Sequence, residues 1–162
     1  MSRNKYQKQV WVLPEDDANR QILQGFILEQ HVRPRAIHML PVAGGWTALR
    51  DSFKREYNDS LRNHPECLMV LLVDFDGQSV ERLQRVLSGV DDTLKDRVFV
   101  LGSKSEPEKL KTALGMNYEA IGRTLARECF SGQHETWMHE LLAHNRQELE
   151  RMTSRVKPVL FG

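Results

Sequence analysis

Two aspartates one position apart follow an apolar run in the middle of the chain. Residues 67–73 form a short run rich in Val and Leu, which is typical of a strand buried on both faces. Because strand side chains alternate with a period of two, Asp74 and Asp76 lie on the same face at the carboxyl end of this strand, and Gly77 allows a tight turn. Paired carboxylates at such an edge suit Mg²⁺ or Mn²⁺, although Asp is also a common turn former and helix N-cap.

Three of the four predicted strand ends carry acidic residues. Function in an open α/β sheet collects at the carboxyl ends of the strands, so these segments are the candidate site. After the first strand come Glu15, Asp16 and Asp17, after the second Gly44 and Gly45, and after the fourth the segment 103–108, which contains Lys104, Glu106 and Glu108. The plainer alternative is that Glu15, Asp16 and Glu106 cap the helices that follow.

The elements that position these residues follow from hydrophobic periodicity. The pattern predicts four strands alternating with helices over the first hundred residues, which is typical of an α/β domain with a mainly parallel sheet. We expect a core at 1–115 and a helical C-terminal extension at 116–162 that packs on the core or on a partner. The predicted strands are 9–13, 36–42, 68–73 and 97–101, and the predicted helices are 18–30, 46–62, 79–87, 108–114, 118–130 and 135–152.

This order of strand ends resembles the Toprim domain of topoisomerases, bacterial primases and OLD-family nucleases. The family has a glutamate after its first strand, a glycine after the second and Asp-x-Asp after a later one, which Glu15, Gly44, Asp74 and Asp76 match. The resemblance covers about residues 9–115. It departs from the family at two positions: Asp16 stands where glycine is usual, and Asn19 stands where an acid is common.

The resemblance implies Mg²⁺-dependent (or Mn²⁺-dependent) cleavage of nucleic-acid phosphodiesters. Asp74 and Asp76 would hold the metal, and Glu15 would be a third ligand or the general acid/base. Glu106 and Glu108 are weaker candidates for a second metal, and Lys104 is a weak candidate for contacting a phosphate, although a lysine in such a loop is commonly just solvated.

The resemblance also implies a partner protein. Toprim domains of the OLD type usually accompany an ABC-type ATPase, and this chain has no GxxxxGK[ST] loop. An ATPase supplied by another protein, as in bacterial anti-phage complexes, is therefore an expected partner, and a homo-oligomer is a further possibility. The same fold without catalysis would be a binding or regulatory module.

Composition and charge limit the classes of protein to which this chain can belong. The 162 residues carry a net charge of +1, so no global charge favours a nucleic-acid or membrane surface. Arg33, Arg35, Lys54 and Arg55 could form a basic track, but charged, solvated helix faces are the better interpretation. No apolar run approaches the roughly 20 residues of a membrane span. Residues 1–5 lead directly into a strand, not into a signal-peptide segment, and the two cysteines lack CxxC spacing, so we expect a cytoplasmic protein without a disulfide framework.

Three other interpretations fit the sequence less well. Asp74 and Asp76 also resemble the first motif of HAD-family phosphatases, but that family continues with Asp-Gly-Thr near its N-terminus. A receiver-like signalling domain would need a fifth strand followed by a lysine. A zinc site at His134, His139 and His144 conflicts with their spacing of five, because zinc-protease histidines stand four apart on one helix face.

Overall fold

The four strands form one all-parallel sheet in the computed structural model, which describes residues 7–162. Their order is β2-β1-β3-β4. This confirms the expected α/β fold with a parallel sheet. The expectation that residues 1–5 lead straight into a strand concerns positions outside the described part. The strands are β1 (Gln9–Pro14), β2 (Ile37–Met39), β3 (Cys67–Leu72) and β4 (Val98–Leu101).

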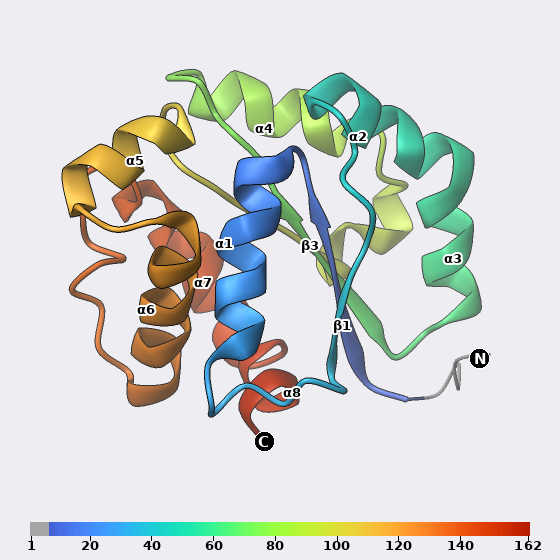
Figure 1. The fold of residues 1–162 in the computed structure, drawn as a ribbon. Coiled ribbons are helices and arrows are strands. Elements are labelled where there is room, and N and C mark those ends of the chain that lie inside the picture. Colours follow the sequence, from blue (N-terminus) through green and yellow to red (C-terminus); the bar gives the residue numbers. More distant parts are fainter. Residues whose placement is uncertain (1–6) are drawn as a thin grey trace.

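Helices cover both faces of the sheet (Figure 1). Successive residues of the strands point to opposite faces, as the period of two requires: Val10 and Val12 face one layer, whereas Trp11 and Leu13 face the other. The first layer contains α1 (Asp17–Leu28), α5 (Pro107–Leu114), α6 (Tyr118–Ser131), α7 (Arg146–Thr153) and α8 (Lys157–Phe161). The second contains α2 (Trp46–Ser52), the π-helical segment η1 (Phe53–Tyr57), α3 (Asn58–Asn63), α4 (Ser79–Leu87) and the 3-10 segment η2 (Asp92–Arg97).

A pair of glycines lets α1 and α6 cross closely. A Cβ atom at Gly25 would lie 2.0 Å from the Glu119 carbonyl oxygen, and one at Gly122 would lie 1.9 Å from the Ile22 carbonyl oxygen. Any side chain at these positions would push the two backbones apart. This contact places α6, and the apolar layer it carries, directly over the sheet.

The predicted helix over residues 135–152 is wrong in its first half. The chain makes turns and the 3-10 segment η3 (Ala143–Asn145) before α7 begins at Arg146. The reason lies in Glu128, a buried residue of α6 whose Oε1 accepts hydrogen bonds from the backbone N–H groups of Thr136 (2.8 Å) and Trp137 (3.2 Å). A capped turn therefore competes successfully with the helical pattern.

The C-terminal segment packs on the domain. Leu160 is buried in the same apolar layer as Val10 of β1, and its carbonyl oxygen accepts a hydrogen bond from the Arg33 N–H at 2.8 Å. The Phe161 ring lies 6.3 Å from that of Phe26 between centroids. Residues after 116 thus complete one face of the core.

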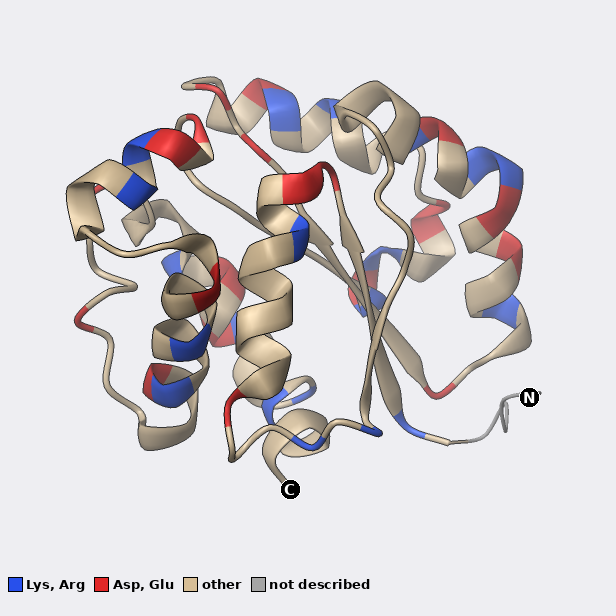
Figure 2. Ribbon diagram, in the orientation of Figure 1, with Lys and Arg blue, Asp and Glu red and all other residues tan. Residues whose placement is uncertain are grey.

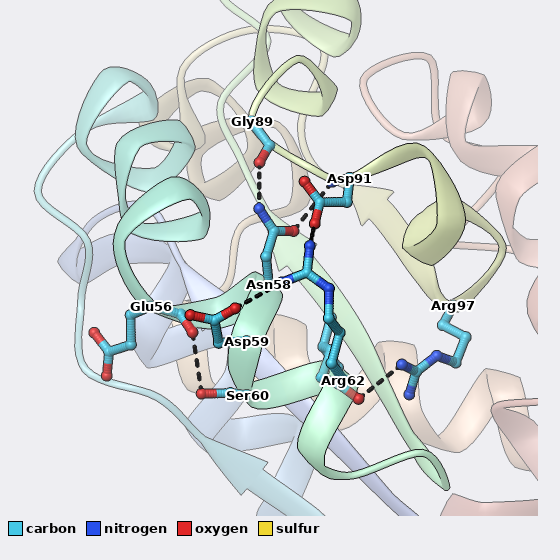
Figure 3. Close-up of polar contacts among 9 residues, drawn as sticks. Glu56, Asn58, Asp59, Ser60, Arg62, Gly89, Asp91 and Arg97 are labelled. Carbon is cyan, nitrogen blue, oxygen red and sulfur yellow. Dashed lines mark hydrogen bonds and ion pairs between the residues drawn. The ribbon is translucent and has the colours of Figure 1, made fainter.

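A polar network connects α3 to the segment after α4 in the second layer, near the amino ends of β3 and β4 (Figure 3). The Asn58 side-chain amide donates to the Gly89 carbonyl (2.9 Å) and accepts from the Asp91 N–H (3.1 Å), and Arg62 pairs with both Asp59 and Asp91. Arg97 donates to four backbone carbonyls of the α3–β3 connection, those of Leu61, His64, Pro65 and Cys67.

Candidate functional site

The ends of β1 and β3 lie side by side at the point where the chain changes direction across the sheet. The two strands are hydrogen-bonded neighbours, but the chain continues from β1 to β2 on one side and from β3 to β4 on the other. The helix after β1 covers one face and the helix after β3 the other. Ligand sites of open parallel sheets collect at such a switch point, outside the carboxyl ends of the strands.

Glu15 and Asp74 meet at this point. Glu15 is only 5% exposed, and its Oε2 accepts a hydrogen bond from the Asp74 backbone N–H at 2.7 Å. The Glu15 N–H in turn donates to the Leu72 carbonyl at 2.9 Å, which extends the pairing of β1 with β3 beyond the strands. Glu15 therefore does not cap α1.

Asp16 is the residue that caps α1. Its Oδ1 accepts from both the backbone N–H and the side-chain amide of Asn19, each at 3.0 Å. The helix-capping interpretation is thus correct for Asp16 and wrong for Glu15. These hydrogen bonds give the side-chain amide of the buried Asn19 a partner.

Asp74 and Asp76 are linked through a tight turn. The Asp76 N–H donates to Asp74 Oδ1 at 2.9 Å, and Asp76 adopts a left-handed backbone conformation with φ of 47°. Asp74 is half-buried, whereas Asp76 is exposed. Phe75 between them points into the second apolar layer, which fixes the turn against the sheet.

The glycines after β2 approach the same point. The backbone N–H groups of Gly44 and Gly45 donate to the Glu15 carbonyl at 2.9 and 3.1 Å. Both glycines have positive φ, which a residue with a side chain rarely adopts. The segment after the second strand is therefore tied to Glu15.

The surroundings of Glu15 and Asp74 disfavour the charged forms of both carboxyl groups. Burial raises the pKa of Glu15 to about 7, and the carboxylates of Asp16 and Asp74 add to the rise. The pKa of Asp74 is also raised, first by burial and then by the carboxylates of Asp76 and Asp16. Hydrogen bonds from backbone N–H groups and the charge of Arg82 partly oppose both changes.

Arg82 is the cation that sequence reasoning missed. It lies on α4, its Nη1 donates to the Asp74 carbonyl at 2.8 Å, and the same atom lies 4.0 Å from Glu15 Oε1. Its side chain is 12% exposed. The sequence could have indicated Arg82 by its position six residues after Asp76, near the start of the helix that follows the third strand.

The segment after β4 lies beside the Asp74–Gly77 turn, but its charged side chains do not join the three carboxylates. The Lys104 carbonyl accepts from the Gly77 N–H at 2.7 Å, and the Lys104 side chain is exposed. Glu106 occupies the N-cap position of α5 without a side-chain cap bond. Among residues 7–162, neither Glu106 nor Glu108 forms a hydrogen bond or ion pair with Glu15, Asp74 or Asp76.

The donor set fits a hard divalent cation shared with a substrate. Within the described residues, no three or more His, Cys, Asp or Glu side chains are grouped as a ready-made metal site. Mg²⁺, however, is commonly held by only one or two protein carboxylates together with water and substrate phosphates. Asp74 and Asp76 supply two neighbouring carboxylates. The pKa of Asp74 is raised first by burial and then by the charge of Asp76, and a bound cation would offset both effects.

The chain matches no known protein-family profile, and comparisons with curated proteins and with solved structures find no significant match. Over the part of the chain that the structure describes, no helix has the length and apolar character needed to cross a membrane.

Proposed function

We propose that this chain is a Toprim-like, Mg²⁺- or Mn²⁺-dependent phosphodiester hydrolase that cleaves nucleic acid. The observation that carries the proposal is the contact of Glu15 with Asp74 across adjacent parallel strands, with the Glu15 pKa at about 7. The glycines after β2 that bond to Glu15 support the same strand-end pattern that the sequence resembles.

Each acid has a separate role in this proposal. Asp74 and Asp76 would hold the cation, which when bound polarises a phosphoryl oxygen and offsets negative charge. Glu15 would be a third ligand or the general acid/base. Without a cation, burial raises the pKa of Glu15 to about 7, which suits proton transfer near neutral pH. Arg82 holds the Asp74 backbone in place and limits the repulsion among the acids.

Other parts of the proposal rest on the resemblance alone. Glu106, at the N-cap position of α5, and Glu108, in the first turn of α5, are the candidates for a second metal, and Lys104 is the candidate for a phosphate contact. A separate ABC-type ATPase, in an anti-phage complex, is the partner that the resemblance indicates. A domain that binds without cleaving is the alternative function.

Cleavage of labelled single-stranded and duplex DNA and of RNA, with Mg²⁺, Mn²⁺ or EDTA, tests the function. We expect metal-dependent cleavage that Asp74→Asn and Glu15→Gln each reduce at least a hundredfold. Asp92→Asn changes an exposed acid of η2, which precedes β4 and so lies at the amino end of the sheet, and serves as the control. Cleavage that persists in purified Asp74→Asn would exclude the metal role of this residue, and no cleavage of any substrate would favour the binding module.

A further inference from the structure

Three arginines surround one tryptophan next to the carboxylates. Trp46, the first residue of α2, has the guanidinium carbons of Arg82, Arg50 and Arg85 at 5.1, 5.5 and 5.8 Å from its ring centroid. Arg50 comes from α2, and Arg82 and Arg85 come from α4. Figure 2 shows basic segments on α4 beside the acidic turn that follows β3. We name Trp46, Arg50, Arg82 and Arg85 the arginine cluster.

The charges of the arginine cluster are incompletely balanced. Arg50 pairs with Asp51 at 3.0 Å, and Arg82 faces Glu15 at 4.0 Å. Arg85 is exposed and forms no ion pair within residues 7–162. Each cation gains from the ring face, but three like charges around one ring repel one another, and a bound anion would relieve this repulsion.

One donor of the cluster is buried and lacks a partner. The Nε atom of Arg82 has no hydrogen-bond partner among the described residues, although its Nη1 bonds to the Asp74 carbonyl. Buried polar groups are nearly always hydrogen-bonded, so the described protein residues leave this guanidinium incompletely satisfied. A guanidinium offers its donors as a planar fork that matches the oxygens of a phosphate.

We propose that the arginine cluster binds the phosphate backbone of a nucleic-acid strand and holds the strand beside Asp74 and Asp76. Arg82 belongs to both groups, because it contacts the Asp74 backbone on one side and the Trp46 ring on the other. The identity of the anion as nucleic acid rests on the proposed function. The cluster explains how a chain with a net charge of only +1 can attract a polyanion: its positive charge is local.

Binding without metal tests the cluster separately from catalysis. The probe is a short fluorescein-labelled oligonucleotide, as single-stranded DNA and as RNA, titrated in EDTA and followed by anisotropy. We expect Arg85→Ala and Arg50→Ala each to weaken binding about tenfold and to lower the salt dependence by about one phosphate contact. Arg85→Lys should recover part of the affinity. Arg123→Ala, an exposed arginine on α6 in the other layer, is the matched control and should bind as wild type does.

Trp46 supplies a readout inside the cluster. Trp11 and Trp137 are buried, whereas Trp46 is partly exposed, so we expect binding to change tryptophan fluorescence in wild type and not in Trp46→Phe. Circular dichroism of every variant excludes unfolding as the cause of lost binding.

The outcomes separate the two proposals. Unchanged affinity in both Arg85→Ala and Arg50→Ala, or no binding by the wild-type protein, overturns the arginine cluster as a phosphate site. Arginine-dependent binding in EDTA without cleavage after Mg²⁺ or Mn²⁺ is added supports the cluster and contradicts the nuclease. Cleavage with an unchanged KM in Arg85→Ala and Arg50→Ala contradicts the cluster and leaves the nuclease standing.

Discussion

The carboxylate of Glu15 accepts a hydrogen bond from the backbone N–H of Asp74, so a side chain from the end of β1 is fixed to the turn after β3. The accepting oxygen belongs to a nearly buried carboxyl group that lies beside two other acids, Asp16 and Asp74. The pKa of Glu15, about 7, expresses the resulting conflict between a favourable bond and an unfavourable environment.

Glu15→Gln should change how stability depends on pH. The pKa of Glu15 rises from 4.5 to about 7 on folding, so the folded wild type holds more protons between these values. Its unfolding free energy therefore falls as the pH rises from 4.5 through 7, by up to about 3 kcal/mol. Gln lacks this titration but can still accept from the Asp74 N–H. Urea unfolding from pH 5 to 8 measures the difference, with exposed Glu135→Gln as control, and parallel profiles for Glu15→Gln and wild type would contradict the pKa.

Mg²⁺ or Mn²⁺ should stabilise the wild-type protein at pH 8. A cation that binds only the folded state at one hundred times its Kd adds about 2.7 kcal/mol. The double variant Asp74→Asn/Asp76→Asn should lose this response, and its Tm without metal should rise because repulsion among the acids is reduced. Asn tolerates the left-handed conformation of residue 76. Thermal unfolding with and without metal is the measurement, and an equal metal response in the double variant would place the cation elsewhere.

Gly122→Ala should destabilise the domain by about 3 kcal/mol. Its Cβ would lie 1.9 Å from the Ile22 carbonyl oxygen, so α6 must move away from α1 and loosen the apolar layer beneath. Arg123→Ala, at the next position on the same helix and exposed, controls for helix propensity. Chemical denaturation compares the two, and a Gly122→Ala protein as stable as wild type would mean that the helices cross less closely.

Arg97→Met should cost about 2 kcal/mol of unfolding free energy. The guanidinium donates to four backbone carbonyls of the α3–β3 connection, and Met replaces its length but none of its donors. Arg62→Met is the matched control, because Arg62 is half exposed and its ion pairs with Asp59 and Asp91 should contribute less than about 1 kcal/mol. Equal losses in the two variants would show that the carbonyl contacts of Arg97 add nothing.

The strands could be predicted from the sequence because each follows from a local apolar run. The approach of Glu15 to Asp74 could be predicted from the rule that neighbouring parallel strands end at the same edge of a sheet. A short apolar run is typical of a buried strand, and the carboxyl ends of parallel strands lie at one edge of the sheet. The predicted helix from residue 135 is wrong because the buried Glu128 of the preceding helix stabilises a turn at Thr136 and Trp137, a side-chain contact that periodicity does not reveal. Arg82 and the pair of Gly25 and Gly122 depend on which helices meet in space, and periodicity along one chain carries no such information.

The position of α8 has a consequence for the order in which the protein assembles during synthesis. Val10, near the start of the chain, shares an apolar layer with Leu160, and the Arg33 N–H bonds to the Leu160 carbonyl. The first strand therefore emerges from the ribosome long before the residues that cover it. Until then the part of the sheet face that α8 covers stays open to water and to chaperones, although α1 and α6 already cover the rest, and the last step of folding waits for translation to pass residue 160.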